Sequence, residues 1–242
     1  MPRLKVVLYG YFFLLLCGIF AFVSCKPGSG SKLDQDDPTE LKYYREQNSR
    51  LAQPAEGERR VVFMGDSITE SWNLAEYFPG KPFINRGIHA QTTSQILLRF
   101  QADVVDLKPR VVVILGGTND IGGNAGPMTL EAIEANLASM ADLARASGIT
   151  VILATLLPVR DIGRVINTQQ RPPARISALN EWIRKYCTEN EIVCLDYFAA
   201  TVDEKGVLKE DLTADGLHPN AKGYEIMKGL AGPAIDRALN GQ

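Results

Sequence analysis

The chain has 242 residues, of which 45% are hydrophobic and 22% are charged, and its formal net charge is −2. These values are typical of a globular protein with a sizeable core, and they exclude a disordered chain, a collagen-like repeat and a multi-span membrane protein. The near-neutral charge and the lack of a long basic run argue against nucleic acid as a partner. His89 and His218 are the only histidines, so the sequence offers little material for a metal site.

The first 24 residues differ from the rest and have the features of an export signal. Arg3 and Lys5 precede an almost unbroken apolar run over residues 6–23. The run ends in the sequence FVSC, which resembles a lipoprotein signal, so Cys25 is predicted to become the lipid-bearing first residue. An uncleaved anchor and a plain secreted form are the alternatives, because about 18 apolar residues can just span a bilayer. All three place the protein in the cell envelope or outside it, and the favoured form is a lipoprotein anchored to the membrane.

The remaining chain divides into a tether and one domain. Residues 25–39 are rich in glycine, serine and aspartate and lack apolar periodicity, so a flexible tether is predicted there. The domain is expected over residues 40–242. It opens with a short helix over Glu40–Ala52, whose apolar residues can share one face.

From Arg59 onward, short apolar runs alternate with stretches of helical periodicity. The runs that predict strands are Val61–Met64, Phe83–Ile84, Val111–Leu115, Val151–Leu157 and Ile192–Leu195. The stretches that predict helices are Thr92–Leu107, Met128–Ser147, Ile176–Asn190 and Ala221–Leu239. Continuous Val- and Ile-rich strands separated by amphipathic helices indicate a parallel sheet covered on both faces. The predicted fold is therefore one three-layer α/β/α domain with five parallel strands.

Polar residues that can carry out acyl transfer follow the predicted strands, where ligands bind in such sheets. Ser67 comes directly after the first strand, at a turn into a helix, where a hydroxyl can be exposed. His218 can remove its proton near neutral pH, and Asp215 is close enough to orient the imidazole, as in a catalytic triad. Gly87 and Asn119 follow the second and third strands, and with the Ser67 N–H they can hold a developing oxyanion.

The segments GDSIT, NRGIHAQTT, GGTND and DGLHPN, in this order and spacing, resemble the SGNH/GDSL hydrolase superfamily. The resemblance runs from about Arg59 to Leu239, and the residues that name the superfamily correspond to Ser67, Gly87, Asn119 and His218. It implies a flavodoxin-like sheet order, a serine esterase or acylhydrolase activity, and no metal or organic cofactor. The longer phrases NRGIHAQTT and GGTNDIGGNAGPMTLEAI resemble a bacterial branch described as lysophospholipase-like or acetylhydrolase-like.

Several of these residues have plain structural alternatives. Ser67 can simply cap the following helix, and Gly87 can serve only as a tight turn. Asp66 and Asp120 are expected to brace their loops. His89, two residues beyond Gly87, is expected to line the rim of the site without being catalytic.

Cys187 and Cys194 lie seven residues apart, at the end of a predicted helix and in the next strand. In an oxidising envelope they could pair, but the direction of their side chains cannot be deduced from sequence. Two free thiols are the favoured interpretation.

The predicted function is a serine esterase that cleaves carboxylic esters through an acyl-enzyme. The segment Pro158–Pro173 is expected to form part of the pocket wall, and its few large apolar side chains favour short acyl groups, such as acetyl, on sugars or small molecules. Longer acyl chains of lysophospholipids or thioesters are the enzymatic alternative. A non-catalytic envelope lipoprotein that binds a glycan or a partner is the alternative from another class. The sequence does not determine the oligomeric state.

Overall fold

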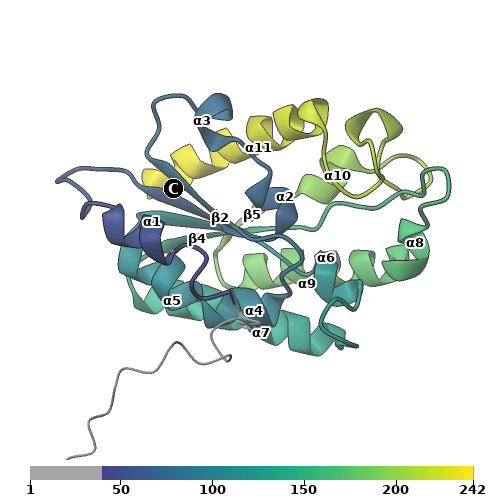
Figure 1. The fold of residues 1–242 in the computed structure, drawn as a ribbon, viewed down its shortest axis with the longest axis horizontal. Helices are drawn as coiled ribbons and strands as arrows, with labels where there is room; N and C mark the ends of the chain where they lie inside the picture. Colours follow the sequence, from purple (N-terminus) through teal and green to yellow (C-terminus); the bar gives the residue numbers. More distant parts are fainter. Residues whose placement is uncertain (1–39, 242) are drawn as a thin grey trace, which may run out of the picture. The chain divides into compact units, whose positions relative to one another are not determined.

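The computed structural model describes residues 40–241, which form a three-layer α/β/α domain (Figure 1). The predicted export signal, the lipidation site at Cys25 and the tether lie outside these residues. Five parallel strands form one sheet in the order β2-β1-β3-β4-β5, which is the flavodoxin-like order that the resemblance implied. The strands are β1 (Val61–Gly65), β2 (Phe83–Gly87), β3 (Val111–Leu115), β4 (Thr150–Ala154) and β5 (Val193–Leu195).

Long helices and short helical turns connect these strands. The longer helices are α7 (Leu130–Ala146), α9 (Pro173–Glu189) and α11 (Ala221–Leu239). The shorter ones are α1 (Arg45–Arg50), α2 (Ser67–Glu70), α3 (Leu74–Tyr77), α4 (Thr93–Leu98), α5 (Phe100–Asp103), α6 (Thr118–Ile121), α8 (Asn167–Gln170) and α10 (Tyr197–Thr201). Two 3-10 helices, Val105–Leu107 and Glu210–Leu212, complete the set.

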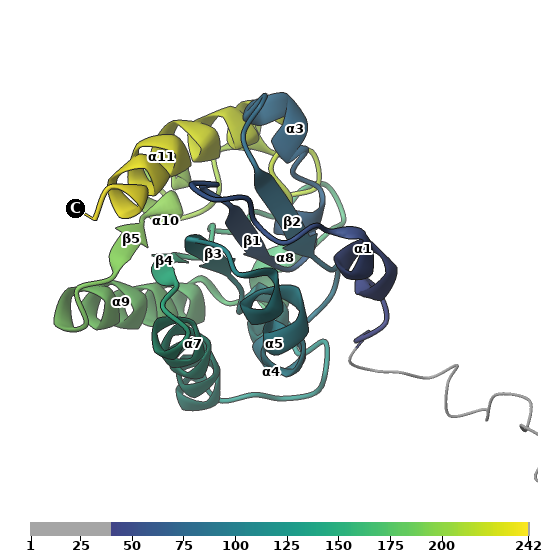
Figure 2. The ribbon, with the colours of Figure 1, turned by 90° about the vertical axis from the view of Figure 1, so that its left-hand side faces the viewer.

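Both faces of the sheet are buried, as the continuous apolar strands predicted. Alternate residues of a strand point to opposite faces, so Val62 and Met64 join one core cluster while Val61 and Phe63 join the other. The first cluster packs against α4, α5, α7 and α9, and the second packs against α2, α3, α10 and α11. Figure 2 shows the sheet between these two helical layers.

Side-chain caps and apolar spacing explain where the long helices run. Helix α7 begins after Thr129, whose hydroxyl accepts the Ala132 N–H, and it buries Ile133, Leu137 and Met140 along one face. Helix α11 begins after Asn220, whose side chain accepts two backbone N–H groups of the first turn. Its bounds are those predicted from the sequence.

Several predicted elements have other bounds in the structure, and contacts of buried side chains explain two of the differences. The helix expected over Thr92–Leu107 is divided into α4, α5 and a 3-10 turn, and Arg99, which ends α4, turns its buried side chain toward Gly65 O and Asp103. The fourth strand ends at Ala154, before the predicted Leu157, because Asn180 of α9 bonds both the N–H and the C=O of Leu156. Those two groups therefore leave the ladder.

The beginning of the domain contains a helix, α1, that is shorter than the predicted Glu40–Ala52. Within residues 40–241, no helix is both long enough and apolar enough to cross a membrane. Cys187 and Cys194 are free thiols, with Cys187 buried.

Candidate active site

The predicted site residues lie at the carboxyl end of the sheet, where loops from several strands meet. Ser67 opens α2 directly after β1, Gly87 ends β2, and Asn119 lies in α6 after β3. Asp215 and His218 belong to the loop that precedes α11. The chain therefore brings segments that lie up to 151 residues apart to one edge of the sheet.

Ser67 occupies the first position of α2, and the residue before it fixes that helix start. Asp66 caps the helix, and its Oδ1 accepts the Ile68 N–H at 3.0 Å. A residue at the start of a helix has a backbone N–H that no helical carbonyl can accept. The Ser67 N–H is consequently oriented outward from the helix, next to its own hydroxyl.

The Ser67 hydroxyl, the His218 imidazole and the Asp215 carboxylate form a continuous hydrogen-bonded chain. Ser67 Oγ lies 2.9 Å from His218 Nε2, and His218 Nδ1 lies 2.7 Å from Asp215 Oδ2. With Nδ1 bonded to the carboxylate, Nε2 is the nitrogen that accepts the hydroxyl proton. These distances are within ordinary hydrogen-bond range, and such a chain of hydroxyl, imidazole and carboxylate can activate a serine as a nucleophile.

Asp215 is held in place by the backbone of its own loop. Its Oδ1 accepts the N–H groups of Leu217 at 2.9 Å and His218 at 2.8 Å. Burial acts to raise the pKa of the Asp215 carboxyl, but the hydrogen bonds from the His218 ring and from these N–H groups outweigh it and lower the pKa to about 2. Asp215 therefore stays ionised and ready to stabilise an imidazolium.

The segment predicted to form the pocket wall also supports the triad loop. Asn167 Nδ2 donates to Asp215 O at 2.8 Å and to Arg160 O at 2.9 Å. Gly216 has a φ of +81°, and a Cβ there would lie 2.0 Å from Arg160 O. Only glycine fits this left-handed turn against the neighbouring backbone, so Gly216 fixes the loop as well as spacing Asp215 from His218.

Asn119 is buried, and within residues 40–241 one of its two amide hydrogens has no acceptor. Its Nδ2 donates to Gln91 O at 3.1 Å, and its Oδ1 accepts from Asn124 Nδ2 at 3.1 Å and from Arg171 Nη2 at 3.4 Å. An amide nitrogen carries two hydrogens, so the second N–H can point at a substrate oxygen. The side chain is thus held firmly and can act as an oxyanion donor.

Gly87 is placed next to α2, but its N–H is already engaged. It donates to Asn85 Oδ1 at 2.8 Å, and Gly87 O accepts the Tyr44 hydroxyl at 2.5 Å. A Cβ on Gly87 would lie 2.1 Å from the Glu70 backbone nitrogen. The close approach of two backbones therefore gives a structural reason for this glycine, and its role as an oxyanion donor stays a prediction.

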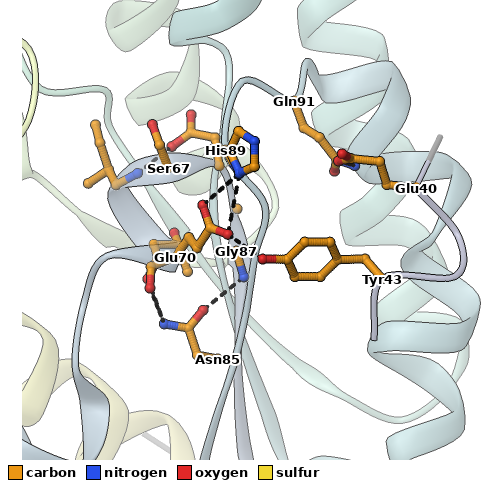
Figure 3. A network of polar contacts seen from close by, with 12 residues as sticks. Glu40, Tyr43, Ser67, Glu70, Asn85, Gly87, His89 and Gln91 are labelled. Atoms are coloured by element: carbon orange, nitrogen blue, oxygen red, sulfur yellow. Dashed lines mark hydrogen bonds and ion pairs between the residues drawn. The ribbon is translucent and has the colours of Figure 1, made fainter. Parts of the chain in front are cut away.

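His89 lies at the exposed rim of the site, paired with a carboxylate from α2. Its Nδ1 lies 3.2 Å from Glu70 Oε2, which also accepts the His89 N–H at 2.9 Å, and its side chain is 64% exposed. Glu70 accepts the Tyr43 hydroxyl at 2.7 Å as well (Figure 3). The sequence did not reveal this pairing, because Glu70 and Tyr43 belong to no recognised motif.

Two buried aspartates are neighbours in sequence of Ser67 and Asn119. Asp120 braces its loop as predicted, since its carboxylate accepts the N–H and the hydroxyl of Thr93. Asp66 is fully buried, and burial raises the pKa of its carboxyl to about 6. Asp66 Oδ2 has no hydrogen-bond partner among the described residues.

The structure also bears on the possibility of a metal. In residues 40–241, no group of three or more His, Cys, Asp and Glu side chains is placed so that it could hold an ion.

Comparisons with known proteins identify relatives in sequence and in structure. A candidate acylhydrolase from Bacteroides fragilis is 39% identical in sequence, covers 84% of this chain and 99% of its own, and superposes with a TM-score of 0.80. A GDSL-like lipase from Bacteroides thetaiotaomicron is 40% identical, with coverage of 83% and 98% and a TM-score of 0.77. The uncharacterized lipoprotein YqeF of Bacillus subtilis is 31% identical over 122 residues, which are 43% of this chain and only 50% of that relative.

The sequence model of the GDSL-like lipase/acylhydrolase family matches residues 63–226. The match includes the serine, asparagine, aspartate and histidine positions described above and covers most of the chain. The protein belongs to the GDSL-like lipase/acylhydrolase family.

Proposed function

We propose that the protein is a serine esterase that works through a Ser67–His218–Asp215 triad. The observation that supports this most directly is the chain of two hydrogen bonds, 2.9 Å and 2.7 Å long, that joins the three side chains. His218 Nε2 takes the proton as Ser67 Oγ attacks the acyl carbon, and the imidazolium then protonates the leaving alcohol. Water repeats these steps on the acyl-enzyme and releases the acid.

The oxyanion of each tetrahedral intermediate is held by the Ser67 N–H and the free N–H of Asn119. We assign a third donor to the end of β2 or to the loop that follows it. Gly87 can supply it once its N–H leaves Asn85 Oδ1. Ala90 is the other candidate, because this exposed residue has a φ of +61°, and such uncommon backbone conformations gather at functional sites.

The preferred substrates are short-acyl esters, such as acetyl esters of sugars or small molecules. The wall segment supports this, because the Arg160 N–H donates to Gly216 O of the triad loop at 2.8 Å, so a segment with polar side chains lies against that loop. One observation favours a second candidate with longer acyl chains, as in lysophospholipids or thioesters. Val165 and Ile166, in the same segment, are 50% and 52% exposed and offer an apolar surface next to Asn167.

We also propose that the enzyme acts in the cell envelope. The apolar leader that ends at Cys25 supports a lipid anchor, and a relative that is 31% identical over part of its length is a lipoprotein. A tethered enzyme of this kind meets esters of envelope glycans, lipids and small molecules.

Hydrolysis of p-nitrophenyl acetate, butyrate and octanoate by the parent and by Ser67→Ala tests the proposal. Loss of the nucleophile should lower kcat on the order of 10³-fold or more, because triad residues act as a unit. A rate that falls with chain length supports short-acyl substrates, and a rate that rises toward octanoate supports the longer ones. If Ser67→Ala keeps activity within tenfold of the parent, the triad assignment is wrong. If neither protein hydrolyses any ester, the non-catalytic binding lipoprotein is the better interpretation.

A further inference from the structure

Arg171 carries a buried cation that the triad mechanism leaves without a role. Arg171 is only 6% exposed. Nη2 lies 3.4 Å from Asn119 Oδ1, and Nη1 lies 3.3 Å from Gln170 Oε1. The Nε–H has no hydrogen-bond partner within the part of the chain that the structure describes. Both hydrogen bonds are long, so this guanidinium is poorly satisfied for a buried group.

A buried cation of this kind opposes folding unless something compensates it. No carboxylate of residues 40–241 forms an ion pair with Arg171 within 4 Å, although the negative charge of Asp66 acts on it from farther away. Removing a charge from water without a partner costs several kcal/mol on general grounds. An apolar side chain of similar size would be the more stable choice, so the cation at this position calls for a functional explanation.

The space around the guanidinium is shaped to hold it against Asn119. A Cβ on Gly122 would lie 2.9 Å from Arg171 Nη2 and 3.0 Å from its Cζ. Gly122 has an ordinary helical φ of −70°, so no backbone conformation requires glycine there. The glycine is explained by the room that the guanidinium occupies.

We propose that Arg171 is a positioning residue for the esterase reaction and acts through Asn119. Its guanidinium, bonded to Asn119 Oδ1, fixes the amide plane and polarises the remaining Nδ2–H toward the substrate carbonyl. As Ser67 Oγ bonds to the acyl carbon, the carbonyl electron pair moves to oxygen, and that N–H meets a full negative charge. A fixed positive charge stabilises a developing oxyanion most where water is excluded. Asn119 is only 3% exposed, so this condition holds at its side chain.

This inference rests on the proposed function, and a double-mutant cycle tests it. Arg171→Met, Asn119→Ala and the double variant are compared with the parent for Ser67-dependent hydrolysis of p-nitrophenyl acetate. Because loss of a direct oxyanion donor costs about 10²–10³-fold in kcat, we expect Arg171→Met, which acts indirectly, to cost about tenfold with KM changed less than twofold. In the Asn119→Ala background the same change should lower kcat less than twofold. Arg171→Lys should recover part of the loss.

A matched control is Arg175→Met, four residues after Arg171 and in the first turn of α9. Arg175 donates to Met128 O at 2.6 Å and has no contact with Asn119, so its loss should leave kcat unchanged. Gly122→Ala, which displaces the guanidinium while keeping the charge, should lower kcat in the same direction as Arg171→Met. It serves as the second variant if Arg171→Met does not fold.

The possible outcomes separate the two ideas. If Ser67-dependent hydrolysis exists but Arg171→Met matches the parent, the role of Arg171 is refuted while the esterase stands. If Arg171→Met lowers kcat equally in the parent and in the Asn119→Ala variant, action through Asn119 is refuted. If Arg171→Met changes KM alone, the role of Arg171 as a positioning residue is refuted and a substrate contact is indicated. Absence of any Ser67-dependent hydrolysis refutes both the esterase and the role of Arg171.

Discussion

Replacement of Asp66 by asparagine should stabilise the protein at neutral pH far more than at acidic pH. Asp66 is 1% exposed, its Oδ1 accepts the Ile68 N–H, and its Oδ2 has no partner within residues 40–241. Burial raises the pKa of this carboxyl from 3.8 to about 6, although the Ile68 N–H and the charge of His218 act in the opposite direction. The folded protein therefore holds a proton on Asp66 more tightly than the unfolded chain does.

The sign and size of the effect follow from proton linkage. A carboxyl whose pKa is raised on folding adds stability below its unfolded pKa, and this stability is lost as the pH rises through the folded pKa. With pKa values of 3.8 unfolded and about 6 folded, the parent loses roughly 2 to 3 kcal/mol of unfolding free energy through Asp66 between pH 4 and pH 7. Asparagine does not titrate, so the variant does not show this loss.

Urea unfolding of the parent and of Asp66→Asn at pH 4, 5, 6 and 7 measures the effect. Asparagine keeps an oxygen for the Ile68 N–H but places an NH₂ group where Oδ2 lacks a partner, and the cost of that group is the same at every pH. The unfolding free energy of the variant minus that of the parent should therefore increase by roughly 2 to 3 kcal/mol from pH 4 to pH 7. A difference that stays constant across this range would show that burial does not raise the pKa of Asp66.

Two further predictions concern regions outside the triad. Tyr44→Phe removes the buried hydroxyl that donates to Gly87 O, and it should lower the unfolding free energy, measured by urea titration, by about 1–3 kcal/mol. The control Tyr43→Phe loses a more exposed hydrogen bond to Glu70 and should lower the unfolding free energy by less than half as much. Equal costs would contradict the buried contact. Cys25→Ser should abolish incorporation of an alkyne-labelled fatty acid and move the protein from the membrane fraction to the soluble fraction, and label retained by the variant would contradict lipidation at this residue.

The strands, and the side chains that meet at their carboxyl ends, could be predicted because their signals are local in the sequence. Both faces of the sheet are covered, so each strand is a continuous apolar run, and the residues after those runs necessarily meet at one edge. The Asp215–His218 contact was predictable for the same reason, since two residues that are three positions apart in one loop stay close in space. The structure shows that contact at 2.7 Å.

What the sequence did not reveal depends on contacts between distant residues. The fourth strand ends early because of Asn180, which lies 24 residues beyond Leu156. Arg171 is a charged residue in a polar loop segment, where exposure is expected, yet it is buried against Asn119, which lies 52 residues earlier. No periodicity or short motif records such pairings.

The N-terminal helix and the residues before it support the active site although the family match begins later, at residue 63. Tyr44 bonds Gly87 O and lies under the Arg86 guanidinium, 4.5 Å from the ring centroid, and Arg86 in turn donates to Asn48 Oδ1 at 2.7 Å. Tyr43 bonds Glu70, which holds the His89 rim (Figure 3). The loop proposed to carry an oxyanion donor is therefore held from outside the region that defines the family.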